Sequence, residues 1–394
     1  MIDKIDTFFK EYQDKILNRD LQYKDIIIIS KDDIRKLYTF NTNDPFEIKV
    51  KKLMNDMYNL TQKDSFRLIN NINTQIKELT NKNPNKRKEY LDLSYESKQL
   101  FIKGMKNLIK DHFKMFDNNI YKLYLDFINT LDNSLAKETT LINLNKKKFD
   151  YDDLALLIYL KFLINGAKSY DSYISISIDE AQDLGYTHFL ALKKIFRRAY
   201  FTIVGDLSQS IYAYRGIRHW NDINQMFTHD ILYLNKSYRN TIEIMEYANK
   251  ILEYLQVSKA TPVIRHGDNV NEIKYTNKVH TILDRIDKHK EKHNSIALIC
   301  KSKDEVDELY KQLSKHIQIT KIDESSESYN GGTCILPIYL SKGLEFDSVI
   351  LSDVDDQNYN KDNILDMKLL YVGITRALHD LDILYKENKQ ELYK

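Results

Sequence analysis

Two segments in the middle of the chain decide its fold. Residues 173–183 read YISISIDEAQD, and residues 199–216 read AYFTIVGDLSQSIYAYRG. The alternation of isoleucine with serine predicts a strand at 173–178, and the apolar run at 199–204 predicts a second strand. A helix is expected at 188–198 between them. This order predicts parallel strands whose carboxyl ends lie at one edge of a sheet.

Acidic and amide side chains follow both predicted strands. Asp179 and Glu180 come directly after the first strand, and Gln209 comes after the second. Because ligands of open parallel sheets bind beyond the carboxyl ends of the strands, we expect a shared site there. Asp179 can hold Mg²⁺, which prefers oxygen ligands, and Glu180 can orient and deprotonate a water. Taken alone, an Asp-Glu pair after a strand is more often a solvated acidic turn.

The surrounding pattern makes the interpretation specific. DEAQD, followed after one helix and one strand by VGDLSQSIY, resembles the second and third motifs of the UvrD/Rep-like superfamily of helicases. The resemblance implies that Asp179, Glu180 and Gln209 act in ATP hydrolysis with Mg²⁺. It also places Tyr214 and Arg215 at a single-stranded nucleic acid, where a ring can stack on any base. A buried core tyrosine is an equally good interpretation of Tyr214, because the chain contains 28 tyrosines.

A fourth motif is expected after a predicted strand at 231–234. Residues 235–241 read NKSYRNT, and the resemblance implies that Tyr238 stacks on the adenine and that Arg239 reaches the γ-phosphate. The forked donors and fixed charge of arginine suit a phosphate. Taken alone, Arg239 would more often be a surface charge at the start of a helix.

The fifth motif matches SKGLEFD at 341–347. The resemblance implies that Gly343 and Glu345 approach the nucleotide, with Glu345 at the ribose. The preceding strand departs from the family pattern, because Tyr339 stands where histidine is usual and Pro337 where threonine is usual. These departures put its contacts with nucleic acid in doubt.

The sixth motif matches KLLYVGITRAL at 368–378, which is expected to be a helix. Arg376 corresponds to the family's arginine finger. On a helix, Val372 and Arg376 share one face, so the charge can be directed from a packed surface. An arginine placed in this way can raise the rate of hydrolysis by about a thousandfold or more.

Periodicity separates the two halves of the chain. Residues 1–150 have apolar side chains at three- and four-residue spacing and no glycine before Gly104, which predicts helices. Later, strands alternate with helices, as in a parallel sheet covered on both faces. With the resemblance, we expect an α/β protein with RecA-like parallel sheets, one partial and one complete, and an amino-terminal mostly helical subdomain. The expected domains are 1–150 (helical, insertion-like), 151–235 (partial first RecA-like) and 236–394 (second RecA-like).

Composition bears on three other properties, namely nucleic-acid binding, cysteine-based sites and membrane association. The net charge is +2, so no basic field covers the 394-residue chain, although local patches can bind nucleic acid. Cys300 and Cys334 lack CxxC spacing, so neither a disulfide framework nor a metal site is indicated. The apolar run at 154–164 is too short to span a bilayer and contains Lys161. With no leader-like segment, we expect a cytoplasmic protein without a membrane partner.

No phosphate-binding loop can be recognised. The chain contains no Gly-Lys dipeptide, and GAKS at 166–169 lacks the earlier glycine of such a loop. PIYLSKGLEFD at 337–347 and PVIRHG at 262–267 resemble the HelD branch, ATPases that bind bacterial RNA polymerase and help release it from nucleic acid. In that branch the phosphate loop precedes the helical insertion, so the resemblance implies that this chain begins at the insertion.

Three functions remain open. The first is the carboxyl-terminal part of a UvrD/HelD-like, ATP-dependent DNA helicase or translocase, which uses ATP and Mg²⁺ on single-stranded or duplex DNA and receives its phosphate loop from a separate chain. The second is a non-catalytic remnant that binds RNA polymerase or nucleic acid. The third, least expected, is an ATPase with an unrecognised phosphate site. In all three, the partial sheet has an unpaired edge, so residues 154–232 should be poorly protected or paired with a partner.

Overall fold

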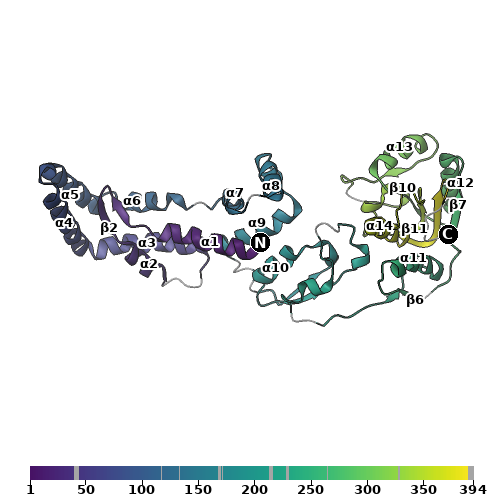
Figure 1. Ribbon diagram of the computed structural model, residues 1–394, viewed down its shortest axis with the longest axis horizontal. Coiled ribbons are helices and arrows are strands. Elements are labelled where there is room, and N and C mark those ends of the chain that lie inside the picture. The colour runs from purple at the N-terminus through teal and green to yellow at the C-terminus, as the bar shows by residue number, and fades with distance from the viewer. Residues whose placement is uncertain are drawn as a thin grey trace. The chain divides into compact units, whose positions relative to one another are not determined.

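The computed structural model describes most of the chain (Figure 1). The described residues are 1–39, 44–116, 118–132, 134–166, 170, 172–212, 216–227, 230–263, 265–326 and 329–388. The chain divides into two compact units, Met1–Ser177 with Gly185–Thr202 and Ile178–Leu184 with Ile203–Lys394. None of the described helices is both long and apolar enough to cross a bilayer.

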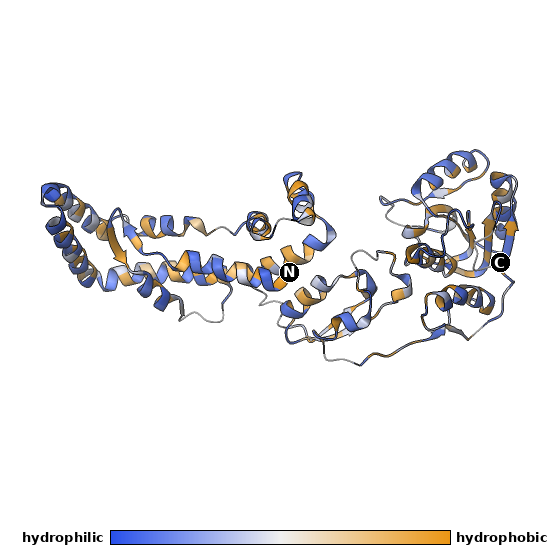
Figure 2. Cartoon of the chain, viewed as in Figure 1, coloured by the Kyte–Doolittle hydropathy of each residue, from blue (hydrophilic) through white to orange (hydrophobic). Residues whose placement is uncertain are grey.

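The first unit consists almost entirely of helices. They are α1 (Ile2–Leu17), α2 (Lys31–Thr39), α3 (Phe46–Lys63), α4 (Ser65–Lys82), α5 (Arg87–Ile102), α6 (Met105–His112), α7 (Ile120–Thr130), α8 (Leu135–Asn145), α9 (Tyr151–Asn165) and α10 (Tyr186–Ile195). A hairpin of β1 (Leu21–Tyr23) and β2 (Ile26–Ile29) interrupts them. Leu53 and Met57, four residues apart on α3, are fully buried, and hydrophilic residues share these helices with hydrophobic ones (Figure 2). The predicted helical character of this segment is confirmed.

The two strands expected in the middle of the chain are present. β3 (Ser175–Ile178) and β4 (Tyr200–Ile203) form a two-stranded sheet. The amides of Tyr200 and Val204 donate to the carbonyls of Ile174 and Ile178 at 2.8 Å, a constant offset typical of parallel strands. The helix predicted between them is α10.

The second unit contains a six-stranded parallel sheet. Its strands are β7 (Asn271–Lys274), β8 (Ser295–Cys300), β9 (Thr320–Lys321), β10 (Gly332–Pro337), β11 (Phe346–Leu351) and β12 (Ala377–Tyr385), in the order β7-β12-β11-β8-β10-β9. The helices of this unit are α11 (Ile242–Tyr254), α12 (Lys278–Lys290), α13 (Lys303–Leu313) and α14 (Ile364–Ile374). A small parallel pair, β5 (Lys236–Ser237) and β6 (Thr261–Pro262), completes it.

Alternate residues of each central strand face opposite layers of helices. In β8, Ala297 and Ile299 pack in one core with α11 and α14, whereas Ile296 and Leu298 pack in another with α12 and α13. A parallel sheet that is buried on both faces requires such near-continuous apolar strands. The predicted α/β class, with helices on both faces of a parallel sheet, is confirmed.

Two local predictions were wrong. Residues 231–234 do not form a strand, because no strand among the described residues pairs with them, and Leu232 and Leu234 are 85% and 91% exposed. The helix expected at 368–378 ends at Ile374. The Thr375 hydroxyl donates to the carbonyls of Tyr371 and Val372 at the last turn, and β12 begins two residues later. Arg376 therefore lies in the turn between helix and strand, not on the helix.

Candidate active site

The acidic pair after β3 has an unusual backbone. Glu180 adopts a left-handed conformation with φ of 51°, which is rare for residues other than glycine. The Glu180 amide donates to Asp179 Oδ1 at 2.8 Å, and the Ala181 amide donates to the Val204 carbonyl at 3.0 Å. Strained residues persist where their surroundings hold them, and they are frequent at functional sites.

Gln182 connects this pair to the loop after β4. Its buried side-chain amide donates from Nε2 to Glu180 Oε2 at 2.5 Å and accepts at Oε1 from the Asp206 backbone at 2.9 Å. A Cβ atom at Gly205 would lie 2.4 Å from Gln182 Oε1, so glycine is required for the close approach. The two strand ends are thus fixed to each other by a side chain to which no role was assigned from sequence.

The same loop presents Gln209. Asp206 Oδ1 accepts from the Ser208 amide, and Oδ2 accepts from Gln209 Nε2, both at 2.9 Å. This bond orients the amide so that its oxygen accepts from Arg376 Nη2 at 3.0 Å. A residue of the third motif and a residue of the sixth motif therefore meet directly.

Arg376 is buried without a carboxylate partner among the described residues. Its Nε donates to the Val372 carbonyl at 3.0 Å, and its Nη1 donates to the Leu344 carbonyl at 3.3 Å. Burial, followed by repulsion from Arg239, lowers the pKa of Arg376 from its ordinary value, although Glu180 and Glu345 oppose this shift. A buried cation is costly unless it is paired. The geometry therefore favours an anion beside this guanidinium.

A cleft of about 320 Å³ lies beside these groups. Four predicted site residues line it, namely Gln209, Tyr238, Arg239 and Arg376, and so does Asp206. The Tyr238 ring is exposed, and Arg239 is paired with Glu345, Nη2 to Oε1, at 2.7 Å.

The other predicted residues do not line this cleft. Asp179 and Glu180 are exposed at the end of β3, and Glu345 is paired with Arg239, which does line the cleft. Gly343 has φ of 79°, so the turn before β11 needs a residue that tolerates the left-handed region. Tyr214 and Arg215 lie outside the residues that the structure describes.

Lys342 is a further site residue that sequence reasoning missed. Its half-buried side chain places Nζ 2.6 Å from Asp183 Oδ2 and 3.3 Å from Glu180 Oε2. Asn240 was missed as well, and its Nδ2 donates to the carbonyls of Thr375 and Ala377 at 3.1 and 2.7 Å. Both residues lie within motifs that were recognised from the sequence. That position was the signal that could have identified them as site residues.

Comparison with protein families gives two matches. The UvrD/REP helicase N-terminal domain matches residues 5–230, which is more than half of the chain. The UvrD-like helicase C-terminal domain matches residues 332–384.

Individual relatives cover shorter stretches. A probable DNA helicase II homolog from Mycoplasma capricolum is 30% identical over 143 residues, 34% of this chain and 18% of that protein. The ATP-dependent DNA helicase srs2 of Schizosaccharomyces pombe is 34% identical over 107 residues, 26% of this chain and 12% of that protein. The chain therefore spans only a small part of the length of these relatives. Among solved structures, the C-terminal domain of a possible DNA helicase from Lactobacillus plantarum is 29% identical, with a TM-score of 0.33, over 40% of this chain and 91% of that one.

Proposed function

The chain belongs to the UvrD/REP helicase family, and from this premise we propose that it carries part of the ATP-hydrolysis site of a UvrD-like, ATP-dependent DNA helicase. The observation that carries the proposal is the hydrogen bond between Arg376 and Gln209. This bond joins two family motifs 167 residues apart at the wall of one cleft.

The cleft residues fit the chemistry of a nucleoside triphosphate. Arg376 and Arg239 supply two cations for phosphate oxygens, and an arginine fork suits them geometrically. The exposed ring of Tyr238 offers a stacking surface for adenine. Gly343 and Glu345 are assigned to the side of the ribose, where the ion pair between Glu345 and Arg239 keeps the carboxylate near the cleft.

We assign the two acidic residues after β3 to the binding of Mg²⁺ and of the attacking water. Asp179 would hold Mg²⁺, and Glu180 would orient and deprotonate the attacking water. Gln182 fixes Glu180, while Asp206 fixes Gln209, so the two groups are held before nucleotide binds. Such positioning is the main contribution that a protein makes to phosphoryl transfer.

A separate chain is proposed to supply the phosphate loop. The sequence contains no Gly-Lys dipeptide, and the described residues offer no glycine-rich cradle for phosphates. DNA is the proposed track, with Tyr214 and Arg215 in contact with it. The likeness of residues 337–347 to the HelD branch supports RNA polymerase as a further partner.

Measurement of ATP turnover tests whether a second chain supplies the phosphate loop. The chain alone is expected to bind Mg-ATP weakly and to hydrolyse little, whereas co-expression with a chain carrying a Gly-Lys-Thr or Gly-Lys-Ser loop, encoded next to it, should give turnover stimulated by single-stranded DNA. Glu180→Gln should abolish this turnover. DNA-stimulated turnover by the chain alone, lost in Glu180→Gln, would exclude the need for a second chain.

A non-catalytic role is the second candidate, and the ion pairs of the site favour it. Arg239 is paired with Glu345, and Lys342 is paired with Glu180, so two of the charges are balanced within the protein. In that case the chain would bind RNA polymerase or nucleic acid without using ATP. Co-purification with RNA polymerase that survives Arg376→Ala, without turnover in any mixture, would select this function.

A further inference from the structure

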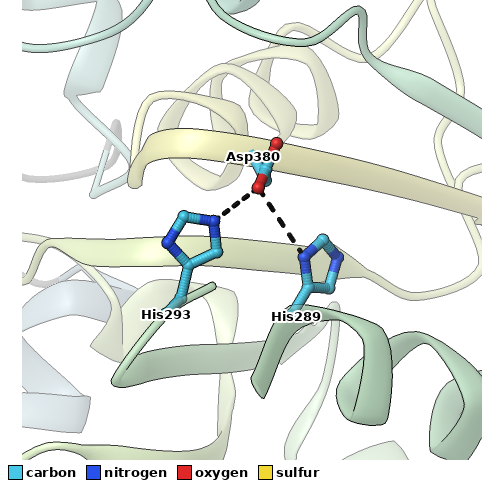
Figure 3. Close-up of side chains that lie close together, drawn as sticks. All are labelled: His289, His293 and Asp380. Atoms are coloured by element: carbon cyan, nitrogen blue, oxygen red, sulfur yellow. Dashed lines mark hydrogen bonds and ion pairs between the residues drawn. The ribbon is translucent and has the colours of Figure 1, made fainter. Parts of the chain in front are cut away.

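Two histidines and an aspartate converge on the sheet face that α12 covers (Figure 3). His289 lies on α12 and His293 lies one turn later, where its amide still donates to the His289 carbonyl at 2.9 Å. Both imidazoles point toward Asp380 of β12 (Figure 3). Asp380 Oδ2 is 2.5 Å from His293 Nε2 and 4.0 Å from His289 Nδ1.

The position of one proton on His289 follows from its other neighbour. His289 Nε2 lies 2.7 Å from Asp382 Oδ2. The fully buried Asp382 also accepts two hydrogen bonds from Arg285, at 2.6 and 2.9 Å, and one from Asn271 at 2.9 Å. A carboxylate surrounded by donors acts only as an acceptor, so Nε2 of His289 carries a proton. This leaves Nδ1, which faces Asp380, as the nitrogen of His289 that can bind a metal ion.

The ligand atoms of the three side chains lie near the spacing of tetrahedral zinc ligands, within 4.8 Å of one another. The separation of 4.0 Å between His289 Nδ1 and Asp380 Oδ2 is too long for a hydrogen bond. In a tetrahedral zinc site, a nitrogen and an oxygen ligand lie about 3.3 Å apart, so this gap must close by about 0.7 Å when zinc binds. The distance of 2.5 Å between His293 Nε2 and Asp380 Oδ2 is shorter than this spacing of about 3.3 Å. The His293 ring must therefore move away from Asp380 by less than about 1 Å when zinc binds.

The surroundings permit this movement and match a metal site. The centroids of the His293 and His379 rings are 5.6 Å apart with an interplanar angle of 6°, so a small shift of His293 parallel to the His379 ring would keep the two planes stacked. His293 and Asp380 are each slightly exposed, which leaves a route for an ion and a fourth ligand from solvent. The contact from Asp382 to the far nitrogen of His289 is the carboxylate–histidine arrangement that orients many metal ligands.

We propose that His289, His293 and Asp380 bind one Zn²⁺ ion that links α12 to β12. The site is separate from the residues assigned to ATP, and the proposal does not depend on the proposed function. The sequence signal is the His-x₃-His spacing, which places two imidazoles on one face of a helix. In the competing arrangement no metal is bound, and protonated histidines form ion pairs with Asp380. The other charged or titratable groups around them are Arg285, Lys292, Asp382 and His379.

Zinc titration of the metal-free full chain separates the two arrangements. Isothermal titration calorimetry at pH 7.5 should give one Zn²⁺ per chain, and Co²⁺ should show the visible absorption of a tetrahedral site. His293→Gln and Asp380→Asn should each weaken Zn²⁺ binding by more than about a hundredfold, and Asp382→Asn by about tenfold to a hundredfold. His280→Gln, an exposed histidine on the same helix, should leave Zn²⁺ binding unchanged.

Two results would overturn the proposal. One is the absence of saturable Zn²⁺ binding and of a tetrahedral Co²⁺ spectrum in the wild-type chain. The other is binding that His293→Gln and Asp380→Asn leave intact. Circular dichroism of each variant controls for folding, and if a variant does not fold, the wild-type Co²⁺ spectrum and the rise of Tm with Zn²⁺ decide the question.

Discussion

The two parallel sheets of this chain differ in how much of their apolar surface is covered. In the six-stranded sheet, β8 is buried on both faces between two layers of helices. At the two-stranded sheet, Ile174, the residue before β3, is 73% exposed, and Tyr200 of β4 is 78% exposed. Parallel strands are ordinarily buried on both faces. The comparison indicates that helices cover both faces of the six-stranded sheet, whereas side chains at the two-stranded sheet that presents Asp179 and Glu180 are left exposed.

Hydrogen exchange should show the largest difference between the sheets. Amides of β8 should exchange only on global unfolding, whereas those of β3 and β4 should exchange at least about a hundredfold faster, because few buried contacts oppose their local opening. Peptide-resolved exchange of the monomeric chain measures both. Equally slow exchange in β3, β4 and β8 of a monomer would remove the distinction.

Side-chain truncation should reproduce the difference in stability. Ile299→Ala removes a fully buried side chain from β8 and should lower the free energy of unfolding by about 2–5 kcal/mol. Val204→Ala, just after β4, removes a half-exposed side chain and should change it by less than about 0.5 kcal/mol. Urea unfolding followed by the fluorescence of Trp220, the one tryptophan of the chain, reports both. Similar losses for the two variants would contradict the comparison.

The strands and loops that were predicted correctly from the sequence are those that local residue patterns determine. The carboxyl ends of β3 and β4 were located to within one residue, because alternation and apolar runs mark strands, and the place of Gln209 in the loop after β4 follows. Residues 231–234 look equally strand-like, but a strand also needs a neighbour to pair with, and that information is not local. Arg376 was placed on a helix because apolar residues continue past Ile374, whereas a hydroxyl of Thr375 ends the helix there.

Other features depend on contacts between distant segments. Lys342 was part of a recognised motif, but its two carboxylate partners lie about 160 residues earlier, and Asp183 is one of them. The histidine cluster was missed for the same reason, since Asp380 comes 87 residues after His293. Three-dimensional proximity, not residue type, identifies both groups.

The contact between Gln182 and the loop after β4 can be tested by substituting Gly205. Gly205→Ala would place a methyl group 2.4 Å from Gln182 Oε1 and 3.0 Å from the Trp220 ring. We expect a loss of about 1–3 kcal/mol in unfolding free energy, because the buried amide must shift. Gly331→Ala is a useful control, since no atom lies within 4 Å of its added carbon and only its positive φ opposes the change. A shift in Tm no larger than that of the control would argue against a tight contact at Gln182.

The helical unit should show a smaller, pH-dependent effect at His112. Burial, with a contribution from Arg19, lowers the pKa of His112 from 6.5 to about 4. Between these values the unfolded chain binds more protons at His112, so the stability that depends on this residue is fully present above pH 6.5 and falls as the pH falls toward 4. His112→Phe should reduce this loss by about 1–2 kcal/mol. Urea midpoints of both proteins from pH 7 to pH 4 provide the measurement, and parallel curves would show that His112 does not contribute.

The most direct test of the nucleotide cleft is equilibrium binding of a fluorescent ATP analogue with Mg²⁺ to the folded chain. Wild-type protein should bind weakly but saturably. Arg239→Ala and Arg376→Ala should each weaken binding by at least about tenfold, as expected for the loss of a charge-assisted contact to phosphate. Arg67→Ala, an exposed arginine on α4, should bind as the wild type does. Unchanged affinity in both cleft variants would contradict the assignment of this site to ATP.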